Sequence, residues 1–557
     1  MLVVPLALLA FLSLTLMIPG WGLWYSPSLS YRFQTEALLH GSLAVRNTPY
    51  AHLHDWAWGN GMQQAWGLGV PILRLPFEIL AKTFGLPGFP DRVTFLVYFS
   101  LTTWLVWSFL KEASDEVRLT YLILLCFSPI FLTLCSGRFA VYEECIAYGH
   151  LWTVLLLALA YRYHANPSPF SFRILSITAG LGCLIRPTLL GPGFIALALC
   201  LVFFFSASGM RIGLFLFSIG PSLLLLTNFL RFGSPLEFGQ GLQLTIDSHD
   251  FCIRFGYPYA TEPISSAAIE LFASLFLFDG VHDSTIYPHL SRTFRYREFS
   301  FASFGIDTLA VLILSWLMLF IAWRQNKLNP LTRFGFAWSF ITFFTLFFFF
   351  MYHPGLYSRY LGDFTPAISL GIAVGLHQLL NLQNSRRASL FIVMALFGWI
   401  LCQAMLKIET PLGNSDRIDR IPTAWDEASG PSLPARYQCQ DPNLPYRIPH
   451  NGSGWATRGS CQVSAETTLF FKDLRCVEIQ FEETQKNGLK TPVQAKLQLE
   501  NLTPVLDQND GANRVMRFCR NKITTSGFQR LSIGWGTKEN LRAGPYPIKL
   551  FSVTKID

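Results

Sequence analysis

The chain has 557 residues, of which 51% are hydrophobic and only 14% are charged. Ordinary soluble domains carry roughly 25% charged residues, so a large part of this chain must have lipid as its solvent. The net charge of +8 does not indicate nucleic-acid binding, because lysines and arginines gather in short loops between apolar segments. We therefore predict a polytopic α-helical membrane protein with membrane lipid, and no nucleic acid, as a partner.

Apolar segments long enough to cross a bilayer recur up to about residue 406. A spanning helix needs about 20 apolar residues, and about 11 transmembrane helices can be placed on this basis. They begin near residues 3, 93, 118, 147, 173, 189, 212, 306, 334, 365 and 390. The first segment has no basic flank and no convincing cleavage site, so we interpret it as a retained helix and not as a signal peptide.

The positive residues predict the orientation of these helices. In an 11-helix topology the loops that carry them share one face, which the positive-inside bias makes cytoplasmic. The residues are Lys111, Arg118, Arg162, Arg173, Arg211, Arg324, Lys327, Arg333, Arg386 and Arg387. The N-terminus is then cytoplasmic, and the long loops 25–91 and 231–300 and the C-terminal tail are periplasmic, as in a bacterial inner (plasma) membrane protein.

Composition changes after Lys407, which divides the chain into a transmembrane domain, 1–406, and a soluble outer-face domain, 407–557. Alternating apolar and polar residues predict half-buried strands at 477–481, 494–499, 515–518 and 530–535. Short strands separated by turn residues are typical of a β-sandwich or jelly roll.

The soluble tail contains four cysteines, an even number that fits two disulfides in an oxidising compartment. They are Cys439, Cys461, Cys476 and Cys519. Sequence leaves the three pairings open, and four buried free thiols are the alternative.

The first outer loop, 25–91, is too polar to span a bilayer but is dense in aromatics, glycines and prolines. Its candidate acids are Glu36, Asp55 and Glu78. Tyr31 to His40 predicts a short interfacial helix that Gly41 ends. On this helix Glu36 is either part of a polar face toward water or a carboxylate that its neighbours keep ionised.

The part of this loop from Ala65 to Pro90 is rich in glycine and proline, so we expect it to be irregular or re-entrant. Non-helical backbone at membrane depth must be satisfied by protein or water, which predicts an outward-facing cavity here. Trp56 and Trp58 either stack on sugar faces or anchor the loop at the interface, and anchoring is the interpretation we favour.

The second outer loop, Ser136 to Ile146, carries Arg138, Glu143 and Glu144 just before a predicted helix. Adjacent carboxylates at a membrane boundary are costly unless they are solvated, paired or functional. They either hydrate the helix start, where negative charge also suits the helix dipole, or serve a site. We favour a functional role for at least one of them.

A short polar segment, Arg186-Pro187-Thr188, separates two apolar segments near the predicted outer face. An arginine at a helix end can simply snorkel to the interface. However, Arg359, Tyr360 and Asp363 are predicted at the outer face as well. Converging arginines would form an anion site, because guanidinium groups bind phosphate bidentately.

A metal site has weaker support in the sequence than the anion site. Three His-Asp pairs, 54–55, 249–250 and 282–283, lie in outer loops, but their spacing does not bring them together, and we interpret them as polar loop composition. If a divalent cation is used, Glu143 or Glu144 would ligate it.

The sequence has no Walker A loop, no zinc-protease or Gly-x-Ser-x-Gly motif, and no dinucleotide fingerprint in a strand-to-helix setting. Hydrolysis of a cytosolic nucleotide is therefore not supported. An outward-facing membrane enzyme would then need an activated substrate that is already in the membrane. A lipid-linked phosphosugar meets that requirement.

The membrane part resembles GT-C integral-membrane glycosyltransferases, which include protein mannosyltransferases and lipid A aminoarabinose transferases. The resemblance lies in the long first outer loop, Glu143-Glu144, Arg186-Pro187-Thr188, the run 228–239 and Arg359-Tyr360. It implies a polyprenyl-phosphate sugar donor and a glycan, lipid or protein acceptor. Phosphate binding would then fall to Arg186 and Arg359, with Arg138.

One position departs from this family, whose members usually carry an Asp or an acidic pair at the start of the first outer loop. This chain has Ser26-Pro27-Ser28-Leu29-Ser30-Tyr31 there. The general base would then be Glu36 or Asp55. A flippase for lipid-linked saccharides, and an inactive assembly protein with a polysaccharide-binding tail, are the alternatives.

Overall fold

The computed structural model describes residues 26, 30–45, 56–59, 61–86, 88–111, 115–126, 128, 131, 139, 141–204, 210–239, 268–269, 271–272, 275–276, 304–351, 360–382, 436–438, 461–462, 466–472, 475–483, 493–497, 500–510, 513–520, 528–535 and 548–556. The chain forms two compact units. The first comprises Met1–Leu29, Gly67–Leu224 and Ile253–Ile418, and the second comprises Ser30–Trp66, Leu225–Cys252 and Asp419–Asp557. The predicted boundary at residue 407 lies outside the described residues and stays a prediction.

Helices occupy nine of the predicted apolar segments. They are α4 (Asp91–Phe109), α5 (Asp115–Cys126), α7 (Val141–Ala165), α8 (Pro169–Ile185), α9 (Leu190–Phe203), α10 (Met210–Phe232), α14 (Ile306–Arg324), α15 (Pro330–Met351) and α16 (Leu361–Leu382). In the described part of the chain α7, α10, α14 and α15 are long and apolar enough to cross a membrane. The segments near 3 and 390 lie outside the described residues, and the count of about 11 spans stays a prediction.

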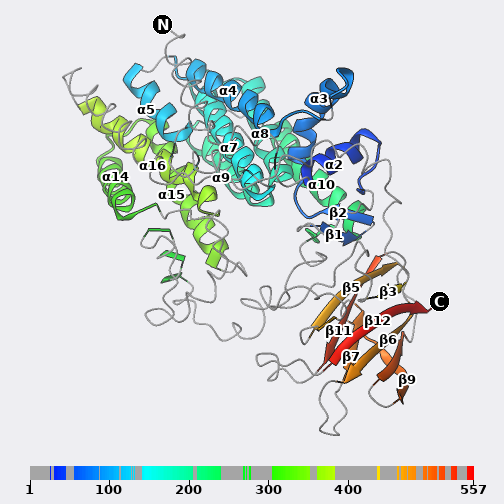
Figure 1. Ribbon diagram of the computed structural model, residues 1–557. Coiled ribbons are helices and arrows are strands. Elements are labelled where there is room, and N and C mark those ends of the chain that lie inside the picture. The colour runs from blue at the N-terminus through cyan, green and yellow to red at the C-terminus, as the bar shows by residue number, and fades with distance from the viewer. Residues whose placement is uncertain are drawn as a thin grey trace. The chain divides into compact units, whose positions relative to one another are not determined.

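Helix α7 is the centre of the first unit. It packs against α4, α8, α9 and α16, and Figure 1 shows α4, α7, α8 and α9 side by side. Its 18-residue apolar stretch is 78% buried, against 22% for the corresponding stretches of α10 and α14. Polar side chains on α7 are therefore enclosed by protein, which makes this helix the natural support for a site.

Small residues bring the helix backbones of this unit into close contact. A Cβ atom on Gly220 of α10 would collide with the carbonyl oxygen of Gly180 on α8. A Cβ atom on Gly193 of α9 would lie 2.5 Å from the carbonyl oxygen of Ala179. Membrane helices associate through such small-residue contacts, because lipid provides no hydrophobic driving force between them.

The prediction of an irregular segment from Ala65 to Pro90 is wrong over Gly69–Thr83, which forms helix α3. Pro71 lies in the first turn, where backbone N–H groups have no acceptor within the helix. Gly67 and Gly69 contact the backbone of Leu184 and Ile185 at the end of α8, so these glycines serve close packing. Tertiary contacts thus stabilise a helix in spite of unfavourable local composition.

In the second unit the predicted interfacial helix is present as α2 (Ser30–Leu39), and Gly41 follows it with φ +71°. A hairpin of β1 (Trp56–Gly59) and β2 (Gly61–Gln64) comes next. The buried Arg231, in the last turn of α10, donates to the carbonyl oxygens of Gln64 and Trp66. A single side chain therefore holds the end of the hairpin to the end of α10.

The tail contains two antiparallel sheets, and every strand predicted from alternation is confirmed. One sheet has the order β3 (Arg436–Gln438), β12 (Ile548–Ile556), β6 (Cys476–Glu483), β10 (Asn513–Cys519), β9 (Thr503–Asp510), with β4 (Cys461–Gln462) also paired to β12. The other has the order β5 (Glu466–Lys472), β11 (Phe528–Trp535), β7 (Val493–Leu497), β8 (Glu500–Asn501). Stacking of the two sheets as a sandwich or jelly roll stays a prediction.

A disulfide joins two of the four tail cysteines, Cys476 on β6 and Cys519 on β10. The two residues are directly opposite each other at the end of the strand pair. Among the described residues the free cysteines are Cys126, Cys145, Cys183 and Cys200, all buried in the helical part. One disulfide in the tail is therefore confirmed, and the second stays a prediction because Cys439 and the side chain of Cys461 lie outside the described residues.

Candidate functional site

Arg186, Tyr360 and Asp363, which the sequence placed at one face, come together in the first unit. The Arg186 Nη2 lies 2.9 Å from the Asp363 Oδ2. The guanidinium also lies over the Tyr360 ring, 5.2 Å from its centroid. Arg359 precedes Tyr360 in the sequence and lies outside the described residues.

Local backbone structure explains why Arg186 occupies this place. Helix α8 ends at Ile185, and Arg186 adopts an extended conformation before the 3₁₀ turn Pro187–Leu189. Proline disfavours helical geometry in the residue that precedes it, so Pro187 forces this break. Asp363 lies in the first turn of α16, where the helix dipole favours a negative charge.

The guanidinium of Arg186 is the cationic group of this cluster. It has five N–H donors, and among the described residues Asp363 is its one carboxylate partner. The side chain is buried, with 7% of its surface exposed. The arrangement is chemically suited to an anion, because a guanidinium binds oxyanions strongly in surroundings that screen charge weakly.

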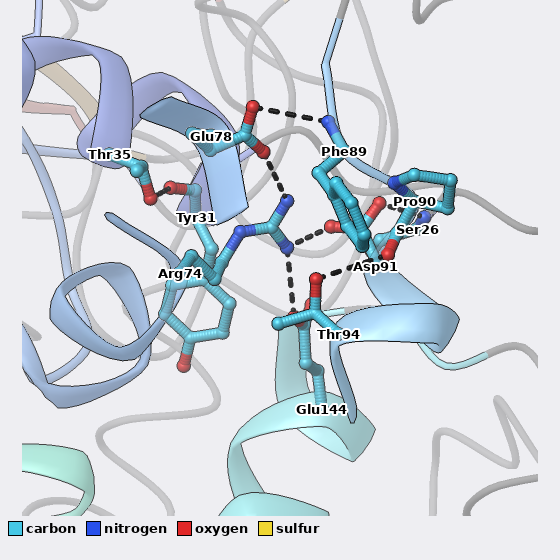
Figure 2. A network of polar contacts seen from close by, with 10 residues as sticks. All are labelled: Ser26, Tyr31, Thr35, Arg74, Glu78, Phe89, Pro90, Asp91, Thr94 and Glu144. Atoms are coloured by element: carbon cyan, nitrogen blue, oxygen red, sulfur yellow. Dashed lines mark hydrogen bonds and ion pairs between the residues drawn. The ribbon is translucent and has the colours of Figure 1, made fainter. Parts of the chain in front are cut away.

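A second charged cluster surrounds Arg74, a buried residue of α3 (Figure 2). Its Nη1 donates to the Glu144 Oε1 at 3.1 Å and also to the Asp91 Oδ1, and its Nη2 donates to the Glu78 Oε1 at 3.1 Å. Further backbone donors hold two of these acids: Ser26 N–H bonds Asp91 at 2.8 Å, and Phe89 N–H bonds Glu78 at 3.2 Å. One arginine thus connects α3, α4 and α7.

The charges of this cluster determine its protonation. Burial disfavours the charged form of Arg74, but the carboxylates of Glu144 and Glu78 outweigh that effect and raise the pKa of Arg74. Arg74 is therefore charged at neutral pH. The described residues include no group of three or more His, Cys, Asp or Glu side chains that could hold a metal ion.

Both acids of the predicted second outer loop lie in the first turn of α7 and are buried. Glu144 accepts a hydrogen bond from Arg74, so of the two alternatives drawn from the sequence the hydrated helix start does not apply to it. Burial without pairing would be costly for such a group, and the ion pair explains how it is tolerated.

The other predicted residues lie in the second unit or outside the described residues. Glu36 belongs to the second unit, and its carboxylate lies 3.7 Å from His40 with 13% of the side chain exposed. Trp56 and Trp58 lie on β1, and their side chains are outside the described residues, as are Asp55 and Arg138. The roles assigned to these residues stay predictions.

Sequence reasoning did not identify Arg74 and Asp91 as site residues, and it named Glu78 only as one acid of the loop. The usable signal was the spacing of Arg74 and Glu78, which is i,i+4 on a helix. It was missed because the surrounding glycines and prolines indicated irregular structure.

No protein-family model matches the sequence, and neither does any curated protein. Among solved structures the chain is similar to arabinosyltransferase EmbB from Mycobacterium smegmatis, with 11% sequence identity and a TM-score of 0.34. The match covers 98% of this chain and 64% of that chain, less than two thirds of its length. A TM-score at this level does not establish a common fold.

Proposed function

We propose that this protein is a membrane glycosyltransferase that moves a sugar from a polyprenyl-phosphate carrier to a glycan, lipid or protein acceptor at the outer face of a membrane. The observation that carries the proposal is the Arg186 guanidinium with its five N–H donors, buried beside Asp363 and Tyr360, and Asp363 is its one carboxylate partner among the described residues. These donors suit the phosphate of a lipid-linked sugar, which must be recognised next to the bilayer.

Arg186 has two tasks in this reaction. It binds the donor phosphate in the ground state, and it stabilises the charge that grows on the phosphate as the bond to the sugar breaks. Asp363 orients the guanidinium through one nitrogen, and the Tyr360 ring supports its plane. Arg138 and Arg359 are proposed to share the phosphate.

The acceptor needs a general base within hydrogen-bond reach of its hydroxyl proton. We assign this role to Glu36 or Asp55. Glu36 has a partly exposed carboxylate next to a titratable neighbour, His40. Glu144 is already engaged by Arg74, so we assign to it the positioning of α3 against α7, and to Glu143 the orientation of the acceptor.

The test is sugar transfer by the purified protein in lipid nanodiscs, with polyprenyl-phosphate-linked mannose, arabinose and aminoarabinose as donors. Arg186→Gln is expected to lower kcat/KM for the donor by about 10²- to 10³-fold, because an electrostatic contact to the leaving group is lost. Arg186→Lys is expected to retain part of the rate, since it keeps the charge without the bidentate geometry.

Arg118→Gln is the matched control. Arg118 also pairs with one aspartate, Asp115, at 3.1 Å, and its guanidinium also lies over an aromatic ring, that of Trp107. This variant should transfer sugar at the parental rate. Equal rates for Arg186→Gln and the parent protein would refute the assignment of Arg186.

The base is tested with Glu36→Gln, Asp55→Asn and Glu143→Gln in the same assay. The base variant should lose kcat at all donor concentrations and keep donor affinity, because it acts on the acceptor. If none of the three lowers transfer, the base lies elsewhere.

A flippase for lipid-linked saccharides is the second candidate. It draws support from the buried charges on α3, α7 and α16, because ionisable groups buried among membrane helices often mark a transport path. Translocation of a fluorescent polyprenyl-phosphate sugar across proteoliposomes without any transfer would favour this function over the enzyme.

A further inference from the structure

A small cavity lies inside the first unit, where α7, α15, α16 and the turn between α8 and α9 meet. The volume of this cavity is about 10 Å³. Polar side chains from all four elements line it: His150 from α7, Thr188 from the turn, Thr342 from α15 and Asp363 from α16. A volume of this size accommodates a single water molecule.

His150 lines this cavity, and its ring has one hydrogen-bond acceptor without a partner among the described residues. Its Nε2 lies 2.5 Å from the carbonyl oxygen of Leu125, and a carbonyl oxygen can only accept, so the Nε2 carries the hydrogen. In the neutral ring the Nδ1 then has a free lone pair. His150 is 2% exposed, and its Nδ1 has no hydrogen-bond partner among the described residues.

Thr188 and Thr342 present hydroxyl groups that are likewise unpaired within the described part of the chain. Each hydroxyl can donate one hydrogen bond. The Asp363 carboxylate, which is paired with Arg186, adds a second acceptor. By contrast, the hydroxyl of Thr153, also in the lining, is satisfied by the carbonyl oxygen of Gly149 at 2.9 Å.

We propose that the cavity binds one internal water molecule. This water donates to the His150 Nδ1 and to the Asp363 carboxylate, and it accepts from the hydroxyls of Thr188 and Thr342. The two acceptors and two donors match the four hydrogen bonds of a water molecule, and leaving buried polar atoms unpaired costs more than binding it. A sodium ion fits this lining less well, because it cannot donate to an imidazole nitrogen.

The bound water connects the Arg186–Asp363 ion pair to the central helix α7. Its binding is independent of the proposed transferase activity, since it follows from the donors and acceptors of the cavity alone. It fixes the orientation of the carboxylate that in turn holds Arg186. The site is therefore a positioning element for whatever anion Arg186 binds.

The sign of a stability change tests this inference. In a hydrated cavity Thr342→Val removes one partner of the water and should lower the Tm of the full-length protein by about 1 to 3 °C. In a dry cavity the same substitution removes an unpaired hydroxyl and adds an apolar methyl group, so the Tm would rise. Thr153→Val is the control in the same lining, with an expected change under about 1 °C.

A Tm for Thr342→Val that rises or stays constant overturns the inference. A Tm of the parent protein that falls when sodium is replaced by choline at constant ionic strength also overturns it, in favour of a cation. An experimental density map should show an isolated peak about 2.7 to 3.2 Å from the His150 Nδ1. An empty cavity in a map that resolves other internal waters would refute the water directly.

Discussion

The Arg186 guanidinium lies 2.9 Å from the Asp363 carboxylate, and both side chains are buried. This pair joins the break between α8 and α9 to the first turn of α16. The attraction between two buried charges is largely offset by the cost of removing them from water. Removing one partner is therefore much more damaging than removing both.

We expect Asp363→Leu to lower the free energy of unfolding by about 3 to 5 kcal/mol, because it leaves the Arg186 charge unpaired. The double variant Arg186→Met/Asp363→Leu should recover most of this loss. Denaturant titration of the three variants in detergent measures both effects. The double variant should still fail in sugar transfer, and equal instability of the single and double variants would show that packing and not charge is responsible.

Arg74 forms ion pairs with three acids, one each on α3, α4 and α7. Its removal should therefore destabilise all three of these contacts. Arg74→Met is expected to destabilise the protein by about 3 to 5 kcal/mol at neutral pH, because the buried carboxylates lose the cation that they share. Arg173→Met, at an exposed position of α8, is the control and should change stability by under about 0.5 kcal/mol.

The pH dependence of the Arg74→Met variant has a definite sign. The pKa of Arg74 is raised, so Arg74 stays protonated as the pH falls, and the pH dependence of the difference comes from its carboxylate partners. In the variant the carboxylates repel one another only while they are ionised. The difference in Tm between parent and variant should therefore shrink as the pH is lowered, because protonation removes this repulsion. A constant difference from pH 7 to pH 4 would contradict this account.

Gly220 and Gly191 allow the helix contacts to be tested. Gly220→Ala should lower the free energy of unfolding by about 1 to 3 kcal/mol, because the new methyl group meets the Gly180 carbonyl oxygen. At Gly191 of α9 the nearest atom to a new Cβ is the Thr345 Cγ2 at 3.8 Å. Gly191→Ala should therefore raise stability by about 0.5 to 1 kcal/mol. Thermal unfolding of the two variants should shift in opposite directions, and a loss at both positions would refute the packing argument.

The sequence by itself determined the kind and the approximate position of the apolar helices, of α2 and of four strands in the tail. An apolar segment of sufficient length and a strand with alternating polarity are properties of neighbouring residues, so nine helices and the four strands at 477–535 could be predicted. The break at Arg186 was also local, because Pro187 imposes it on the preceding residue.

Tertiary structure alone decided which charges meet. The partners of Arg74 come from three helices and those of Arg186 from distant segments, and no spacing in the sequence encodes a contact between separate helices. It also turned the glycine- and proline-rich stretch before Asp91 into helix α3, because packing against α8 and the ion pairs of Arg74 outweigh weak local propensity. Local patterns are sufficient for the strongly apolar helices and the alternating strands, whereas α3 and the site depend on contacts that only the packed bundle provides.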